Sequence, residues 1–276
     1  MRRAGNLIVA VALAATCAGC APAGGEPGSV VTRAEDEESL TIGIRFDQPG
    51  LSERTVDGRF VGFDVDVATH VAGELGVPPE NITWRETVPA QRESDITSGA
   101  VDLVVAAYSI TDERKRQVGF AGPYFETGQD LLVRRSAADI TGPASLAGRR
   151  LCSVTGSTSA EQVKQRFARS VHLREYPRNS DCVTALLAGQ VDAVTTDAAI
   201  LAGFVAQNPE LLRLVGTPLS TERYGVGLRK DDAEGRAAVA AAIEHMIDTG
   251  AWRESLRRHL GRAGLPLPDP PEVTER

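Results

Sequence analysis

The fold is decided between Gly62 and Leu75, where the chain reads GFDVDVATHVAGEL. Asp64 and Asp66 fall in the first turn of a predicted helix, where the helix dipole favours negative charge. Apolar residues follow at three- and four-residue spacing, at Val67, Ala68, Val71, Ala72 and Leu75. This pattern predicts an amphipathic helix packed on a sheet, as in many α/β proteins.

Strand and helix patterns alternate along the rest of the chain. The first set has predicted strands at 40–44, 81–84, 101–105 and 130–133, and helices at 90–98 and 111–117. The second set has strands at 150–154, 171–176, 191–195 and 224–228, and helices at 159–168, 181–187 and 237–260. A Gly followed by a strand that opens on Val-Asp occurs in both sets, at 98–102 and 188–192. The repeat predicts two similar α/β lobes, and ligands of such sheets bind beyond the carboxyl ends of the strands.

The N-terminus has the features of an export signal. A basic start is followed by an apolar run and by Cys17-Ala18-Gly19-Cys20, which looks like a lipobox. We therefore expect a signal peptide over 1–19 and a lipidated Cys20. Residues 20–38 are small, then acidic, and are predicted to be a flexible tether. Residues 264–276 form a proline-rich tail without helix or strand periodicity.

Charge and cysteine usage exclude several classes of function. The formal net charge of -7 argues against nucleic acid as a partner, because phosphate binding needs a basic face. Once Cys17 and Cys20 are set aside, Cys152 and Cys182 remain, and an even pair in an exported protein indicates a disulfide. The alternative is two small buried residues. Two Cys without neighbouring His offer too few ligands for a metal, so we expect no metal and no cofactor.

Three polar segments are candidates for ligand binding. Arg114 follows two hydroxyl residues after the 101–105 strand, and its planar fork matches a carboxylate; the alternative is a solvated charge in a charged run. Thr158 and Glu161 have capping-box spacing, so a helix that starts there either binds an anion or is simply capped. Asp197 follows the 191–195 strand and either pairs with an ammonium group or caps the next helix.

The order of these motifs resembles the bacterial solute-binding proteins of family 3, which have the type II periplasmic-binding fold. The resemblance covers about residues 40–262 and rests on 62–75, 107–114, 120–124, 155–159, 191–197 and 224–225. Residues 46–50, 84–86 and 91–93 resemble the glutamate-binding lipoproteins of ABC importers in high-GC Gram-positive bacteria. The resemblance implies a larger lobe over 39–126 plus 224–263 and a smaller lobe over 127–223. It also implies hinges near 126–130 and 220–224.

The resemblance also implies roles for particular residues. Arg114 binds the α-carboxylate with Ser109 and the N–H of Thr158, and Asp197 binds the α-ammonium with Ser109 and the Ala107 carbonyl. Other positions would contact the rest of the ligand. Arg92 and Arg45 would bind an acidic side chain, or else be solvated surface charges, and Asn179 and Ser157 would be polar groups. Phe46 and Tyr108 would be apolar walls, or else core residues.

These expectations amount to a lipid-anchored, monomeric, non-enzymatic receptor on the outer face of the cytoplasmic membrane. It would deliver glutamate, or else aspartate, asparagine or glutamine, to an ABC permease and its ATPase. Two alternatives stay open at this point. One is an enzyme of the same fold, of the cyclohexadienyl dehydratase type, and the other is an amino-acid sensor that acts through a membrane kinase.

Overall fold

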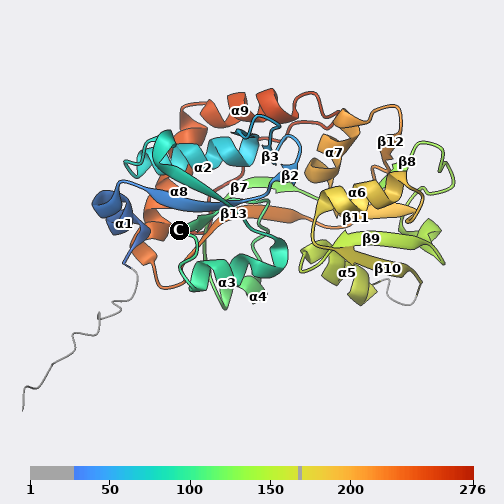
Figure 1. Cartoon of the computed structure of the whole chain (residues 1–276), viewed down its shortest axis with the longest axis horizontal. Helices are drawn as coiled ribbons and strands as arrows, with labels where there is room; N and C mark the ends of the chain where they lie inside the picture. The colour runs from blue at the N-terminus through green and yellow to red at the C-terminus, as the bar shows by residue number, and fades with distance from the viewer. Residues whose placement is uncertain (1–27, 167–169) are drawn as a thin grey trace, which may run out of the picture.

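The computed structural model describes residues 28–166 and 170–276 and contains two mixed sheets. The predicted signal peptide and Cys20 lie outside the described residues, as does the first part of the predicted tether, up to residue 27. Figure 1 shows the two sheets side by side along the long axis of the molecule. No helix in these two ranges is long and apolar enough to cross a membrane.

The first sheet has the strand order β5-β1-β6-β13-β7. Its strands are β1 (Leu40–Ile44), β5 (Ile82–Glu86), β6 (Leu103–Val104), β7 (Gly119–Thr127) and β13 (Glu222–Leu228). Strand β1 is parallel to β5 and β6, whereas β13 is antiparallel to β6 and β7. The helices of this lobe are α1 (Val30–Glu37), α2 (Phe63–Glu74), α3 (Arg92–Thr97), α4 (Asp112–Lys115), α8 (Ala233–Asp248) and α9 (Ala251–Leu260). Three short strands form a separate sheet beside it: β2 (Asp47–Gln48), β3 (Ser52–Arg54) and β4 (Phe60–Val61).

The second sheet repeats the mixed pattern, with the order β10-β9-β11-β8-β12. Its strands are β8 (Gln129–Arg134), β9 (Arg150–Val154), β10 (His172–Tyr176), β11 (Ala193–Asp197) and β12 (Leu212–Leu214). Its helices are α5 (Thr158–Arg166), α6 (Asn179–Leu187) and α7 (Ala198–Gln207). Three short 3-10 helices complete the two lobes. In the first lobe η1 (Pro79–Asn81) and η2 (Pro89–Gln91) flank β5, and in the second η3 (Pro143–Leu146) precedes β9. The chain passes between the two sheets at Gly128 and again between β12 and β13.

Helix α2 is the helix predicted from residues 62–75, and its stripe is buried as expected. Val67, Ala68, Val71 and Ala72 are fully buried in the core that α2 shares with β1 and α8. Gly62 precedes the helix with φ 134°, and a Cβ there would lie 2.1 Å from the Leu51 carbonyl oxygen. Only glycine fits this close approach between the helix start and the preceding turn.

The expectation of a flexible tether up to residue 38 is wrong for its last part. Residues 30–37 form α1, in which Val30 and Ala34 are buried. The Val30 N–H donates to the Asp232 carboxylate at 2.7 Å, and Arg33 pairs with Asp102 at 3.0 Å. Val30 and Ala34 are four residues apart, just ahead of the acidic residues 35–38. Their packing on the first lobe orders the segment.

The proline-rich tail also packs on the first lobe. Val273 is buried, and Glu275 exchanges two backbone hydrogen bonds with Gly122, at 3.0 and 2.7 Å. The Lys115 ammonium pairs with the Glu275 carboxylate at 3.0 Å. The tail has no helix, as the sequence indicates, but it adds a bridge to the end of the first sheet.

Candidate functional site

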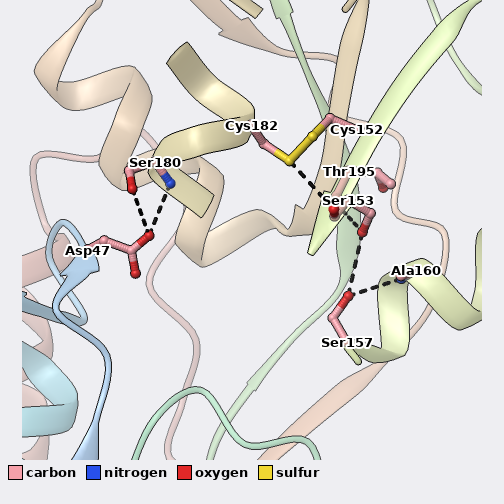
Figure 2. Close-up of a disulfide and its surroundings, with 8 residues drawn as sticks. All are labelled: Asp47, Cys152, Ser153, Ser157, Ala160, Ser180, Cys182 and Thr195. Carbon is pink, nitrogen blue, oxygen red and sulfur yellow. Dashed lines mark hydrogen bonds between the residues drawn. A yellow bond between two sulfur atoms is a disulfide. The ribbon is translucent and has the colours of Figure 1, made fainter. Parts of the chain in front are cut away.

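The two lobes touch at several points near a cavity. Asp47 of β2 accepts hydrogen bonds from the Ser180 backbone N–H at 3.0 Å and from its hydroxyl at 3.1 Å, at the start of α6 (Figure 2). Gly156 approaches Ala90 so closely that a Cβ would lie 2.8 Å from the Ala90 backbone. Gly156 also has φ 76°, so a larger residue would be strained as well as blocked.

The cavity lies between the lobes, and residues of both lobes line it. Its lining includes eight of the predicted site residues: Arg92, Ala107, Ser109, Arg114, Ser157, Thr158, Asn179 and Asp197. The sequence missed six further lining residues: Gln48, Pro89, Val154, Ser159, Thr196 and Ile200. Thr196 and Ser159 are direct neighbours of predicted residues, so their positions could have been inferred; Gln48 carries no such signal.

Arg114 is held at the cavity by the start of α4. The Thr111 hydroxyl caps this helix by accepting the Arg114 backbone N–H at 3.2 Å. The buried guanidinium donates to the Ser109 carbonyl at 2.8 Å and to the Gly156 carbonyl of the second lobe at 3.3 Å. The interpretation of Arg114 as a solvated surface charge is therefore wrong.

Arg92 is the first residue of α3 and is 3% exposed. It donates to the Ala106 carbonyl at 2.5 Å and lies 3.5 Å from the Ala107 carbonyl. Its Nε has no hydrogen-bond partner among the described residues. Burial, followed by the charges of Arg114 and Arg45, lowers the pKa of Arg92 to about 10, so it stays protonated at neutral pH.

Tyr108 is a support for these two cations and is absent from the cavity lining. The guanidinium carbons of Arg92 and Arg114 each lie 5.0 Å from the centre of its ring, within the range of cation–π contacts. Its hydroxyl donates to Glu93 at 2.8 Å, and Glu93 also lies 3.4 Å from Nε of Arg114. Glu93 therefore contacts both the Tyr108 ring system, through its hydroxyl, and the Arg114 guanidinium. The sequence did not point to Glu93 as a site residue.

Asp197 comes from the second lobe, at the end of β11, and is 4% exposed. It precedes α7, but in the described structure its side chain makes no capping bond to that helix. The carboxylate instead accepts the Tyr224 hydroxyl at 2.6 Å and lies 3.5 Å from the Ser159 hydroxyl. Burial, and next the charge of Glu222, raise the pKa of Asp197 to about 7. The helix-cap alternative is therefore wrong for this residue.

The 155–159 loop starts α5 as predicted, but a different residue caps the helix. The Ser157 hydroxyl accepts the Ala160 backbone N–H at 3.0 Å (Figure 2). The Thr158 hydroxyl points elsewhere and donates to Glu222 at 3.1 Å. The capping box predicted from Thr158 and Glu161 is wrong, because the helix begins one residue earlier than that spacing requires.

Arg45 and Phe46 lie apart from the cavity lining. Arg45 is fully buried, donates to Asp47 at 2.7 Å and to the Thr87 carbonyl at 3.2 Å, and so already has a counter-charge. Phe46 packs against Phe60, with ring centres 4.9 Å apart. The structure places both residues behind the site, where they support β2 and its neighbours.

Asn179 lines the cavity from the start of α6. Its side-chain oxygen accepts the Gln48 amide at 3.1 Å, which adds another contact between the lobes. In the part of the chain that the structure describes, the Asn179 amide nitrogen and the Gln48 amide oxygen have no partner. These groups leave a donor and an acceptor for a polar ligand.

The predicted disulfide is confirmed. Cys152 on β9 and Cys182 on α6 are bonded, with Cα atoms 5.7 Å apart. Figure 2 shows the bond between the strand and the helix, with Ser180 on the same helix in contact with Asp47. The bond therefore fixes the helix whose first turn lines the cavity and contacts the other lobe.

The two mixed sheets and the cavity between them define a type II periplasmic-binding fold. Residues 40–262 match the family described as bacterial extracellular solute-binding proteins, family 3. The chain belongs to this family, as its motifs predicted.

Curated relatives include glutamate-binding proteins. GluB of Corynebacterium efficiens is 43% identical over 246 residues, which cover 86% of this chain and 83% of that protein. GluB of Corynebacterium glutamicum is 42% identical over 270 residues, or 94% and 90% of the two chains. Among solved structures, an ancestral arginine-binding protein bound to glutamine has a TM-score of 0.76 at 32% identity, covering 81% of this chain and 98% of that one.

Proposed function

We propose that this chain is an extracytoplasmic receptor of an ABC transporter that binds an acidic amino acid, with glutamate as the preferred ligand. The α-carboxylate binds Arg114 together with Ser109 and the N–H of Thr158. The α-ammonium binds Asp197 with Ser109 and the Ala107 carbonyl, and the side-chain carboxylate binds Arg92. The names of the relatives support this assignment, since both GluB proteins are described as glutamate-binding.

One observation about Arg92 carries the choice of an acidic ligand. The charged side chains of the cavity lining are two guanidinium groups, Arg92 and Arg114, and one carboxylate, Asp197. Glu93 contacts Arg114 from outside the cavity, but among the described residues Arg92 makes hydrogen bonds only to carbonyls and no ion pair with a carboxylate. A buried cation without a counter-charge is costly. Glutamate supplies two carboxylates and one ammonium, which complements this set, whereas glutamine leaves Arg92 unpaired.

Closure of the lobes follows from the position of these groups. Arg92 and Arg114 belong to the first lobe and Asp197 to the second, so a ligand bound by all three draws the lobes together. Bending at the two crossings, near 126–130 and 220–224, accommodates the motion. The closed form is the one that the permease recognises, and water exclusion strengthens each charged contact.

A thermal-shift screen of the common amino acids tests the ligand assignment. A ligand that binds only the native protein raises its unfolding temperature. Glutamate should give the largest shift, followed by aspartate, asparagine or glutamine. The largest shift from arginine or from an apolar amino acid would refute the assignment.

The anchoring and the transport role need separate tests in cells. Cys20→Ala should release the protein from the membrane fraction into the medium, with Cys17→Ala as the matched control that stays anchored. Deletion of the gene should reduce uptake of labelled glutamate if the chain serves an ABC importer. Normal uptake together with an altered transcriptional response to glutamate would favour the sensor alternative.

A further inference from the structure

Two histidines and a glutamate meet between two helices of the first lobe. His70 and Glu74 occupy successive turns of α2, and His245 faces them from α8. One ligand atom from each residue lies within 4.8 Å of the other two. None of the three residues lines the ligand cavity.

The distances suit a small metal ion after modest adjustment. His245 Nδ1 lies 3.0 Å from Glu74 Oε1, and His70 Nε2 lies 3.9 Å from the same oxygen. A tetrahedral Zn²⁺ with bonds of about 2.0–2.2 Å places its ligand atoms about 3.3 Å apart. His245 and Glu74 are 53% and 40% exposed, so their side chains have room to move by the difference.

Of the described residues in this cluster, His70 contributes a ring nitrogen without a hydrogen-bond partner. Its Nε2 is buried and has no hydrogen-bond partner within the described ranges. A buried ring nitrogen without a partner is available to bind a metal ion.

We propose that His70, Glu74 and His245 bind a divalent transition-metal ion, with water completing its coordination. Two imidazoles and one carboxylate suit Zn²⁺ and its neighbours in the first transition row rather than Mg²⁺ or Ca²⁺, which prefer oxygen ligands. The ion links the second half of α2 to α8. The N-terminus of α2, which contacts the cavity loop, lies at the other end of that helix. The sequence did not predict this site, because the third ligand, His245, lies on α8, far from His70 and Glu74 along the chain.

Calorimetric titration of the full chain with ZnCl₂ tests the proposal directly. The protein carries no histidine tag and has Cys17→Ser and Cys20→Ser substitutions, so that free thiols do not bind the metal. We expect one Zn²⁺ per chain and a higher unfolding temperature with the metal. His70→Ala, His245→Ala and Glu74→Gln should each weaken binding by at least about tenfold.

His172→Ala is the matched control, because His172 is exposed on β10 in the other lobe. It should leave the affinity for Zn²⁺ unchanged. Equal far-ultraviolet circular dichroism of all variants without metal establishes that they are folded. Unchanged Zn²⁺ affinity in the His70→Ala/His245→Ala double variant, or equal affinity for Mg²⁺, would overturn the proposal.

Discussion

The Asp64 carboxylate accepts the Ala107 backbone N–H at 2.8 Å, and this bond joins the start of α2 to the ligand cavity. The second carboxylate oxygen accepts the Tyr124 hydroxyl at 2.9 Å. Burial raises the pKa of Asp64 to about 6. Ala107 has φ 49°, an unusual conformation for a residue other than glycine, and Asp64 helps to hold it there. Asp64 therefore positions the cavity loop as well as beginning the helix.

Asp64→Ala should lower both stability and ligand affinity. It leaves two buried donors without their acceptor, at Ala107 and Tyr124, which costs about 2–5 kcal/mol of unfolding free energy. Asp66→Ala is the control on the same helix, because Asp66 contacts Ser255 and His259 away from the cavity. Urea unfolding and glutamate titration measure the two effects. Equal glutamate affinity in the two variants would show that Asp64 has no positioning role.

Arg114→Ala should weaken binding of glutamate by about thirtyfold or more. The truncation leaves a buried ligand carboxylate without its cation, and removing one member of a buried charge pair costs about 2–5 kcal/mol. Arg116→Ala, two residues away and exposed, should bind as the wild type does. Calorimetry compares the two variants, and an unchanged dissociation constant for Arg114→Ala would remove Arg114 from the site.

Glutamate affinity should fall as the pH drops below 7. Asp197 must be ionised to bind the ammonium, and in the free protein its pKa is about 7. Each pH unit below that value therefore weakens binding by up to about tenfold, until the lower pKa of the complex is reached. Titrations between pH 5 and 8 measure the slope. A flat profile would contradict the role of Asp197, and Asp197→Asn should bind weakly without any slope.

The unfolding free energy of the ligand-free protein should change with pH in the opposite direction: the contribution of Asp197 to it falls as the pH rises. The pKa of this carboxyl group is raised from 3.8, so the folded state holds the proton more tightly than the unfolded state does. Its ionisation therefore lowers the unfolding free energy as the pH rises from about 4 to 7. Saturating glutamate, which stabilises the ionised form, should reduce this dependence.

Loss of the disulfide should reduce stability more than affinity. The bond closes a loop with a sequence separation of 30, for which chain entropy gives about 3.5 kcal/mol. We expect Cys152→Ala/Cys182→Ala to lose roughly this amount in urea unfolding while still binding glutamate. A double variant as stable as the oxidised wild type would contradict the expectation.

The sequence predicted the fold well because its signals are local. The apolar stripe of α2 and the strand that precedes Asp197 depend only on spacing along the chain. The motif order also identified all three charged residues of the cavity lining, Arg92, Arg114 and Asp197. The sequence could not show which residues each side chain contacts in the folded protein.

The roles of Arg45, Asp64 and Glu93 depend on such tertiary contacts. Arg45 pairs with Asp47 instead of facing the cavity, and Glu93 contacts Arg114 through the fold rather than through sequence proximity. The α1 segment was missed for the same reason, since its two buried residues pack on elements far away in sequence. Spacing identifies an amphipathic face, but only the fold determines what covers it.

The preference for glutamate over glutamine tests the central claim most directly. Calorimetric dissociation constants for both ligands, on the wild type and on Arg92→Ala, measure how much Arg92 contributes to reading the side chain. We expect the wild type to prefer glutamate, with a dissociation constant near micromolar, or about −8 kcal/mol. Arg92→Ala should weaken glutamate more than glutamine and reduce the preference at least about tenfold, as loss of a buried charge pair requires. Equal losses for the two ligands, or tighter binding of glutamine by the wild type, would contradict the account.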